Sequence, residues 1–208
     1  MDKANYFDNT SYACKHTIKS LYNKIERTQK YTEVIENIIF NAKERDFENN
    51  CVIEEMIETF SFFCDSVYSC MDYLGYLIYI YQTRNRICIG EYGKVQSSFH
   101  KIINCYVNID ERSKFAIFQS NDLCDVMSSI EQWYYDIRLI RSKETHYSTG
   151  TILVQDLDIV YSNYVEYGDH PTVTFNLSNI RMYCDSFVRD IKKIIMLMDS
   201  YKIGIVRH

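Results

Sequence analysis

The stretch Glu131–Gly150, EQWYYDIRLIRSKETHYSTG, contains the change from helical spacing to turn and strand residues. Before and within its first half, apolar residues recur at intervals of three and four: Val126, Ile130, Trp133, Ile137 and Ile140. This spacing predicts a helix with one buried face. The second half is rich in residue types that end helices and form turns: Ser142, Thr145, Ser148, Thr149 and Gly150. We therefore predict that the helix ends between Arg141 and His146.

The segments on either side extend this pattern over the whole chain. Helical stripes predict a helix over about residues 10–45, in one or two pieces, a long helix over about 52–83, another after Val95 and a last helix from near Ser178. The segment TRNRICIGEYGK (83–94), with its two Gly, predicts a turn, and Asn108–Ser120 predicts a loop or short helix. Between Gly150 and the last helix, TILVQ and DIVYSNYVEYGDHPTVTFNL have strand composition, with GDHP as a turn. The predicted fold is mainly α: an up-and-down bundle of about four to six helices, with a small antiparallel hairpin or sheet at about 151–176 before the last helix.

Length and composition favour one helical domain over residues 1–208. The chain has one Pro, six Gly and nineteen Tyr, and 47% of its residues are hydrophobic. Its eight Cys are scattered, and no pair has the two-residue spacing of zinc or redox sites, so we expect no metal and no cofactor. The N-terminus lacks a signal sequence, and the most apolar stretch, Tyr73–Tyr81, is too short to span a bilayer. We expect a cytoplasmic protein without membrane contact.

The formal charge of -5 argues against indiscriminate binding to long nucleic acid. The net charge does not exclude a local basic site, because Arg138, Arg141 and Lys143 cluster around the end of the predicted helix. Arg189, Lys192 and Lys193 on the last helix could add to it, although a solvated helix face explains these three better.

Arg141 and His146 combine two kinds of chemistry at the predicted helix end. A guanidinium is always cationic and fits phosphate, whereas an imidazole exchanges protons near neutral pH. On a continuous helix two residues five apart point about 140° from each other, so the pair converges only if the helix stops between them. In the alternative, Arg141 pairs with a carboxylate near the helix end and His146 caps the turn.

An Arg followed by a His after four intervening residues, at the end of a bundle helix, resembles the signature of the HEPN superfamily (higher eukaryotes and prokaryotes nucleotide-binding domains). The words WYYDIRLIRSKETHYSTG are most similar to its stand-alone prokaryotic branches. The resemblance implies a metal-independent endoribonuclease that acts as a homodimer, with a composite site at the subunit interface. His146 would act as base or acid on the ribose 2′-hydroxyl and the leaving oxygen, and Arg141 would hold the scissile phosphate. It also implies a toxin or defence role, with an antitoxin or regulatory protein as partner.

Several residues are candidates to support such a site. Ser142 and Thr145 would contact RNA or simply form the turn. In one branch of the superfamily a Tyr two positions after the His is nucleotidylated; that position is Ser148 here, so we do not carry this regulation over and keep Tyr147 only as a supporting residue. Asp65 and Asp72 lie seven apart on the long helix, and one of them would orient His146 or hold Arg141; otherwise they are exposed or form structural ion pairs.

Two other classes of function compete with the nuclease. A catalytically silent binding or dimerisation module of the same fold is the stronger, because the acidic balance suits protein contacts. A purely structural bundle is the other. The sequence has no nucleophile elbow, paired-His metal motif or phosphate loop, so a conventional hydrolase is poorly supported.

Overall fold

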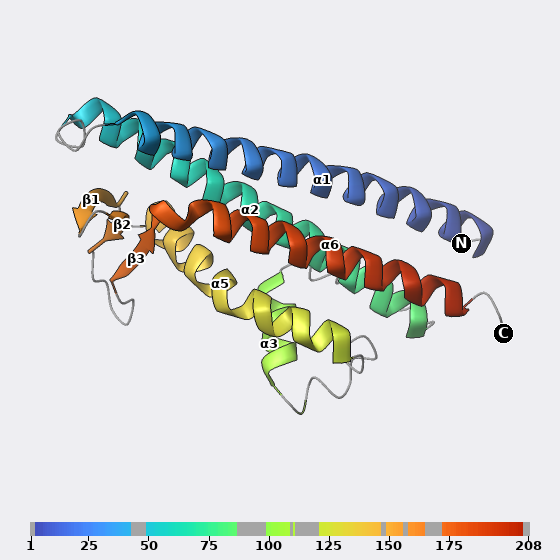
Figure 1. The fold of residues 1–208 in the computed structure, drawn as a ribbon. Coiled ribbons are helices and arrows are strands. Elements are labelled where there is room, and N and C mark those ends of the chain that lie inside the picture. The colour runs from blue at the N-terminus through green and yellow to red at the C-terminus, as the bar shows by residue number, and fades with distance from the viewer. Residues whose placement is uncertain are drawn as a thin grey trace. The chain divides into compact units, whose positions relative to one another are not determined.

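The computed structural model of the chain describes residues 3–42, 49–86, 99–108, 110, 121–146, 149–155, 158–164 and 172–205. Within these residues the chain is mainly helical, with a small three-stranded antiparallel sheet before the final helix, as predicted (Figure 1). The elements are α1 (Lys3–Asn41), α2 (Asn50–Arg86), α3 (Phe99–Val107), α5 (Asn121–His146), β1 (Thr151–Gln155), β2 (Asp158–Asn163), β3 (Val173–Asn176), the 3-10 helix η4 (Leu177–Asn179) and α6 (Ile180–Ile205).

The first helix is continuous, so the alternative of two pieces is wrong. Thr17, Thr28 and Thr32 are buried on this helix, and the Thr32 hydroxyl donates a 2.9 Å hydrogen bond to the carbonyl of Thr28 one turn earlier. Helix α2 runs on to Arg86, into the segment predicted as a turn at 83–94. The rest of that turn, and most of the loop or short helix predicted at 108–120, lie outside the described residues.

The chain divides into two compact units, and α1, α2, α5 and α6 each contribute to both. The first unit comprises Met1–Lys24, Ser69–Glu131 and Val188–His208; the second comprises Ile25–Tyr68 and Gln132–Phe187. The second unit therefore contains the sheet and every predicted site residue except Asp72. That residues 1–208 form a single domain stays a prediction.

An aromatic cluster joins the sheet to α2 in the second unit. The ring of Phe60 lies 4.8 Å from that of Tyr161 on β2 and 4.9 Å from that of Phe175 on β3, centroid to centroid. Phe60 and Tyr161 are fully buried. Each buried aromatic side chain removes about 150–250 Å² from water, so this cluster fixes the sheet on the helix.

The sheet has the strand order β1-β2-β3, with both pairs antiparallel. In its central strand Tyr161 lies between Ile152 on β1 and Phe175 on β3. The sheet is followed directly by a capped turn, in which the Asn176 side chain accepts a 2.9 Å hydrogen bond from the Ser178 backbone N–H. This cap explains why the last helix starts close to the predicted position.

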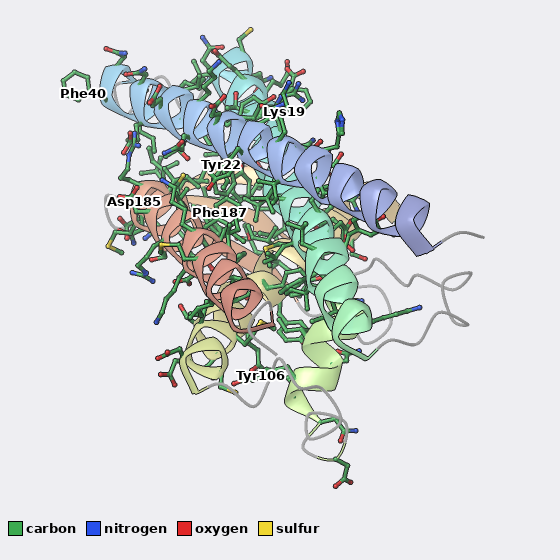
Figure 2. The ribbon with its side chains drawn as sticks, turned by 90° about the vertical axis from the view of Figure 1, so that its right-hand side faces the viewer. Lys19, Tyr22, Phe40, Tyr106, Asp185 and Phe187 are labelled. Carbon is green, nitrogen blue, oxygen red and sulfur yellow. The ribbon has the colours of Figure 1, made fainter. Side chains whose placement is uncertain are left out.

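Helices α5 and α6 are antiparallel in the second unit. The Trp133 and Phe187 rings meet edge to face at 5.5 Å, and the Tyr183 hydroxyl donates a 3.0 Å hydrogen bond to Asp136. Figure 2 shows Phe187 among the side chains between the helices and Phe40 projecting from the end of α1; their exposed fractions are 1% and 88%. The predicted stripe on the last helix is therefore core.

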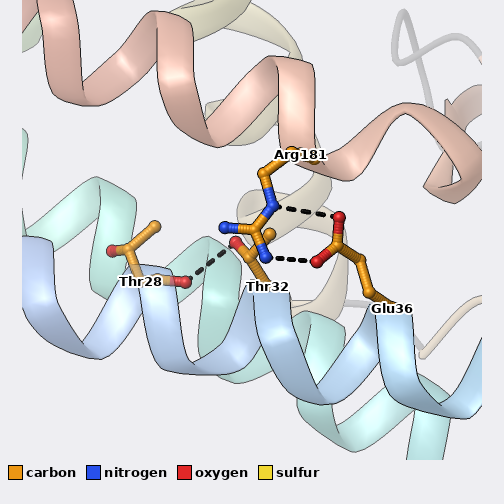
Figure 3. A network of polar contacts seen from close by, with 4 residues as sticks. All are labelled: Thr28, Thr32, Glu36 and Arg181. Carbon is orange, nitrogen blue, oxygen red and sulfur yellow. Dashed lines mark hydrogen bonds and ion pairs between the residues drawn. The ribbon is translucent and has the colours of Figure 1, made fainter.

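An ion pair connects α1 to α6 in the same unit (Figure 3). Arg181 approaches Glu36 with two nitrogens: its Nε donates to Oε1 at 3.0 Å, and its Nη2 donates to Oε2. The guanidinium lowers the pKa of Glu36 through these hydrogen bonds, against the opposing effect of burial. Because both side chains are about 40% exposed (41% and 38%), the pair contributes little to the free energy of unfolding. Its main effect is to align α6 with α1.

The first unit has its own polar contacts. Tyr106 on α3 donates a 3.0 Å hydrogen bond to the carbonyl of Cys124 on α5, and Ser129 donates a 2.7 Å bond to Asp190 on α6.

Among the described residues, no helix is long and apolar enough to cross a membrane. The cysteines described with their side chains, at 51, 64, 70, 124 and 184, are all free thiols.

Candidate functional site

Helix α5 does not end between Arg141 and His146, so that prediction is wrong. It continues to His146, its last residue. At about 100° per residue, the two side chains therefore leave the helix about 140° apart, and their Cα atoms are separated along the axis by about 7.5 Å. Within one chain they do not face a common direction.

Arg141 faces α2, where Asp65 and Tyr68 hold it. Its Nε donates a 2.8 Å hydrogen bond to Oδ1 of Asp65, and its Cζ lies 4.3 Å from the centroid of the Tyr68 ring. The Arg141 side chain is 40% exposed and that of Asp65 is 59% exposed. Of the two predicted aspartates, Asp65 is thus the one that holds Arg141, whereas Asp72 belongs to the first unit.

The two residues that follow Ser142 explain why the helix continues. Lys143 is only 1% exposed, and its Nζ donates to the carbonyl of Asn163 at the end of β2, at 3.4 Å. Glu144 accepts 2.8 Å hydrogen bonds from Ser61 on α2 and from Tyr161 on β2. Helical geometry is thus needed to deliver both side chains to their partners, and this outweighs the turn preference of Ser142 and Thr145.

Burial shapes the electrostatics around Glu144. Removal from water raises the pKa of Glu144, while the hydrogen bonds from Tyr161 and Ser61 oppose that rise and the charge of Asp65 adds to it. Burial, followed by the neighbouring Glu144 carboxylate, likewise raises the pKa of Tyr161 above its ordinary value. The Tyr161 hydroxyl therefore keeps its proton and is the hydrogen-bond donor here, and Glu144 is the acceptor.

Gly150 closes the connection between α5 and the sheet. Its N–H donates a 3.1 Å hydrogen bond to the Tyr161 hydroxyl. A Cβ on this residue would lie 2.5 Å from Cζ of Tyr161 and 2.6 Å from the Ser162 carbonyl oxygen, which leaves no room for a larger side chain. Glu144, Tyr161, Ser61 and Gly150 thus form one polar cluster beside the predicted site.

The remaining predicted residues occupy different environments. His146 and Thr145 are exposed at the end of α5, while Arg138 and Ser142 are partly buried. Tyr147 lies outside the described residues. Among the residues that the structure describes, no group of three or more His, Cys, Asp or Glu is placed to hold a metal ion.

Asp65 was among the residues predicted from the sequence, whereas Tyr68, Ser61, Glu144 and Tyr161 were not. Ser61 lies 83 residues from Glu144, and Tyr161 lies 17 residues from it, so no local spacing links them. The one available signal was Glu144 itself, a carboxylate within Glu131–Gly150 that lies between Ser142 and Thr145, two residues predicted to form a turn.

Comparison with known proteins adds no assignment: no family model matches the chain, and no curated protein or solved structure does so either.

Proposed function

We propose that this chain is a metal-independent endoribonuclease of HEPN type that works as a homodimer, with Arg141 and His146 at a composite site. The observation that supports it most is the exposure of both groups near the end of α5. His146 is exposed at the last residue of that helix, and Arg141, about 1.4 turns earlier, has a side chain that is 40% exposed.

The chemistry follows from the two side chains. An imidazole takes the proton of the ribose 2′-hydroxyl, whose oxygen forms a new bond to phosphorus while the bond from phosphorus to the 5′-oxygen breaks. An imidazolium returns a proton to the departing 5′-oxygen. Arg141 stabilises the negative charge that grows on the phosphate oxygens during this step. The products are a 2′,3′-cyclic phosphate and a 5′-hydroxyl.

The geometry of α5 supports the proposal of a second subunit in the site. Because Arg141 and His146 leave the helix about 140° apart, one chain does not bring both to one phosphodiester. Two copies related by a two-fold axis can place Arg141 of one beside His146 of the other. Arg138, Ser142, Thr145 and Tyr147 are proposed to support RNA binding around this site.

Incubation of the purified protein with end-labelled RNA in EDTA tests the activity. We expect His146→Ala and Arg141→Ala to lose cleavage. His16→Ala and Arg27→Ala serve as controls, since they remove an exposed His and an exposed Arg from α1. Retained cleavage in either site variant, or the same loss in the controls, would refute the proposed site.

Mixing the two inactive variants tests whether the site is composite. If Arg141 and His146 act from different subunits, a mixed dimer holds one intact site, and equal mixing restores about a quarter of wild-type activity. If both act from one subunit, the mixture stays inactive. The result therefore separates the two arrangements without a further structure.

A catalytically silent binding or dimerisation module is the second candidate. The pairing of Arg141 with Asp65 and Tyr68 favours it, because this arginine already has a structural role. Under this alternative the wild-type protein and all variants leave RNA uncut, while analytical ultracentrifugation of the wild-type protein still shows a dimer. A toxin or defence role, with an antitoxin or regulatory protein as partner, is proposed on the resemblance alone.

A further inference from the structure

Asp65 and Tyr68 contact Arg141 in a way that leaves part of its guanidinium unused. Asp65 Oδ1 accepts a 2.8 Å hydrogen bond from Nε, and Tyr68 lies against the plane of the group, with 4.3 Å between Cζ and the ring centroid. Within the described part of the chain, the two terminal nitrogens of Arg141 make no further hydrogen bond or ion pair. Four of the five N–H donors of an arginine belong to these nitrogens.

Both contacts come from one face of α2. Asp65 and Tyr68 are three residues apart on this helix, so their side chains project in similar directions toward α5. Tyr68 is itself supported, because its ring stacks on the buried ring of Tyr134 with centroids 6.3 Å apart and an interplanar angle of 16°. The support under Arg141 thus rests on the core of the second unit.

Such a support changes how an arginine binds an anion. A free arginine must give up its rotamer freedom on binding, which costs roughly thirty-fold in affinity, whereas a held arginine has already given it up. Asp65 also acts in the opposite sense, because its charge competes with the ligand for the guanidinium. For an exposed pair that competition costs at most about fivefold.

Resting on the function proposed above, we infer that Asp65 and Tyr68 are positioning residues, which hold the Arg141 guanidinium so that its terminal nitrogens bind an RNA phosphodiester. Asp65 fixes the group by its Nε side and Tyr68 fixes its plane. A planar fork presented in this way suits the two oxygens of a phosphate, which a lysine at the same position does not match.

The test is binding of a fluorescent RNA oligonucleotide that carries 2′-O-methyl groups throughout, so that it cannot be cut by attack of the 2′-oxygen. Fluorescence anisotropy gives the Kd for the full chain at one fixed salt concentration. We expect Tyr68→Leu to weaken binding by about three- to tenfold. Tyr68→Phe, which keeps the ring, should bind within about twofold of wild type.

Asp65 gives the more demanding comparison. Removing its charge by Asp65→Ala leaves the surface more positive, so simple electrostatics predicts tighter RNA binding. Positioning predicts weaker binding, because the guanidinium becomes free to rotate. Tighter binding by Asp65→Ala, or unchanged binding by Tyr68→Leu in a protein with the wild-type melting profile, would overturn the inference.

Two further variants connect these effects to the arginine. In an Arg141→Ala background, Tyr68→Leu should cause no additional loss, whereas an equal further loss would show that Tyr68 acts elsewhere. Arg141→Lys should bind about as weakly as Arg141→Ala. If Tyr68→Leu fails to fold, the Asp65→Ala and Arg141→Lys results decide.

Failure of the nuclease proposal stays distinguishable from failure of this inference. If the variants weaken binding of the methylated RNA in the expected order while the wild-type protein leaves ordinary RNA uncut, the nuclease is rejected and the positioning role is retained. Cleavage that depends on Arg141 but not on Asp65 or Tyr68 would do the reverse. Absence of any binding to the methylated RNA would reject the inference.

Discussion

The hydroxyl of Tyr161 donates a 2.8 Å hydrogen bond to Oε1 of Glu144, and thereby joins the central strand of the sheet to the last turn of α5. The same carboxylate oxygen accepts from Ser61 on α2, and the same hydroxyl accepts from the N–H of Gly150. Three elements of the second unit therefore meet at these two side chains.

Replacing Tyr161 with Phe should destabilise the fold. The substitution removes one donor from a half-buried carboxylate and the acceptor of the Gly150 N–H, which should lower the free energy of unfolding by about 1–3 kcal/mol. Urea denaturation followed by circular dichroism measures this. Tyr164→Phe is the matched control, because Tyr164 is 55% exposed, and it should stay within about 0.5 kcal/mol of wild type.

Replacing Gly150 with Ala should also destabilise the protein, for a steric reason. The new Cβ would lie 2.5 Å from Cζ of Tyr161, well inside contact distance, so the ring or the backbone must shift. We expect a loss of about 1–3 kcal/mol in the same denaturation experiment. Thr149→Ala changes the exposed neighbouring residue and should be nearly neutral; equal stability of the two variants would contradict the close contact.

The pH dependence of stability should report the ionisation of Glu144. Burial raises its pKa in the folded protein above the ordinary value of 4.5, so its favourable contribution is complete below that value and is lost as pH rises through the folded pKa. Glu144→Gln stays neutral throughout. The stability of this variant relative to wild type should therefore increase between acidic and neutral pH, as measured by denaturation at several pH values. A difference that falls over this range would show the opposite shift.

The Arg181 and Glu36 pair should show a modest coupling with the opposite pH dependence. A double-mutant cycle with Arg181→Ala and Glu36→Ala should give at most about 1 kcal/mol, reduced by added salt, because both side chains are partly exposed. The pKa of Glu36 is lowered, so the coupling is complete above 4.5 and is lost as pH falls through the folded pKa. A coupling that persists in acid would argue against an ion pair.

The helical stripes and the change of spacing after Gly150 were sufficient to predict the mainly helical fold and the sheet before α6. Such patterns succeed because a buried face imposes its period on many residues at once. The stripe on the last helix is an example: Ile180, Phe187, Ile191 and Ile194 are all buried at that spacing.

The end of α5 could not be predicted in the same way. Ser142 and Thr145 are turn formers by local preference, but Lys143 and Glu144 make contacts with Asn163, Ser61 and Tyr161 that only the folded chain supplies. Local preference is a small term, and several tertiary hydrogen bonds exceed it. The pairing of Arg141 with Asp65 was accessible as one of several options, because the sequence offered two aspartates on one helix, but nothing in the spacing chose between them.

The last turns of α5 send closely spaced side chains to different partners: Arg141 to α2, Lys143 to β2 and Glu144 to both. Inserting or deleting one residue between Arg141 and Lys143 would turn every later side chain by about 100° around the helix and shift it by about 1.5 Å. Glu144 would then miss Ser61 and Tyr161 together. The fold therefore fixes the number of residues in this segment more tightly than their identity, and tolerates substitutions here better than changes of length.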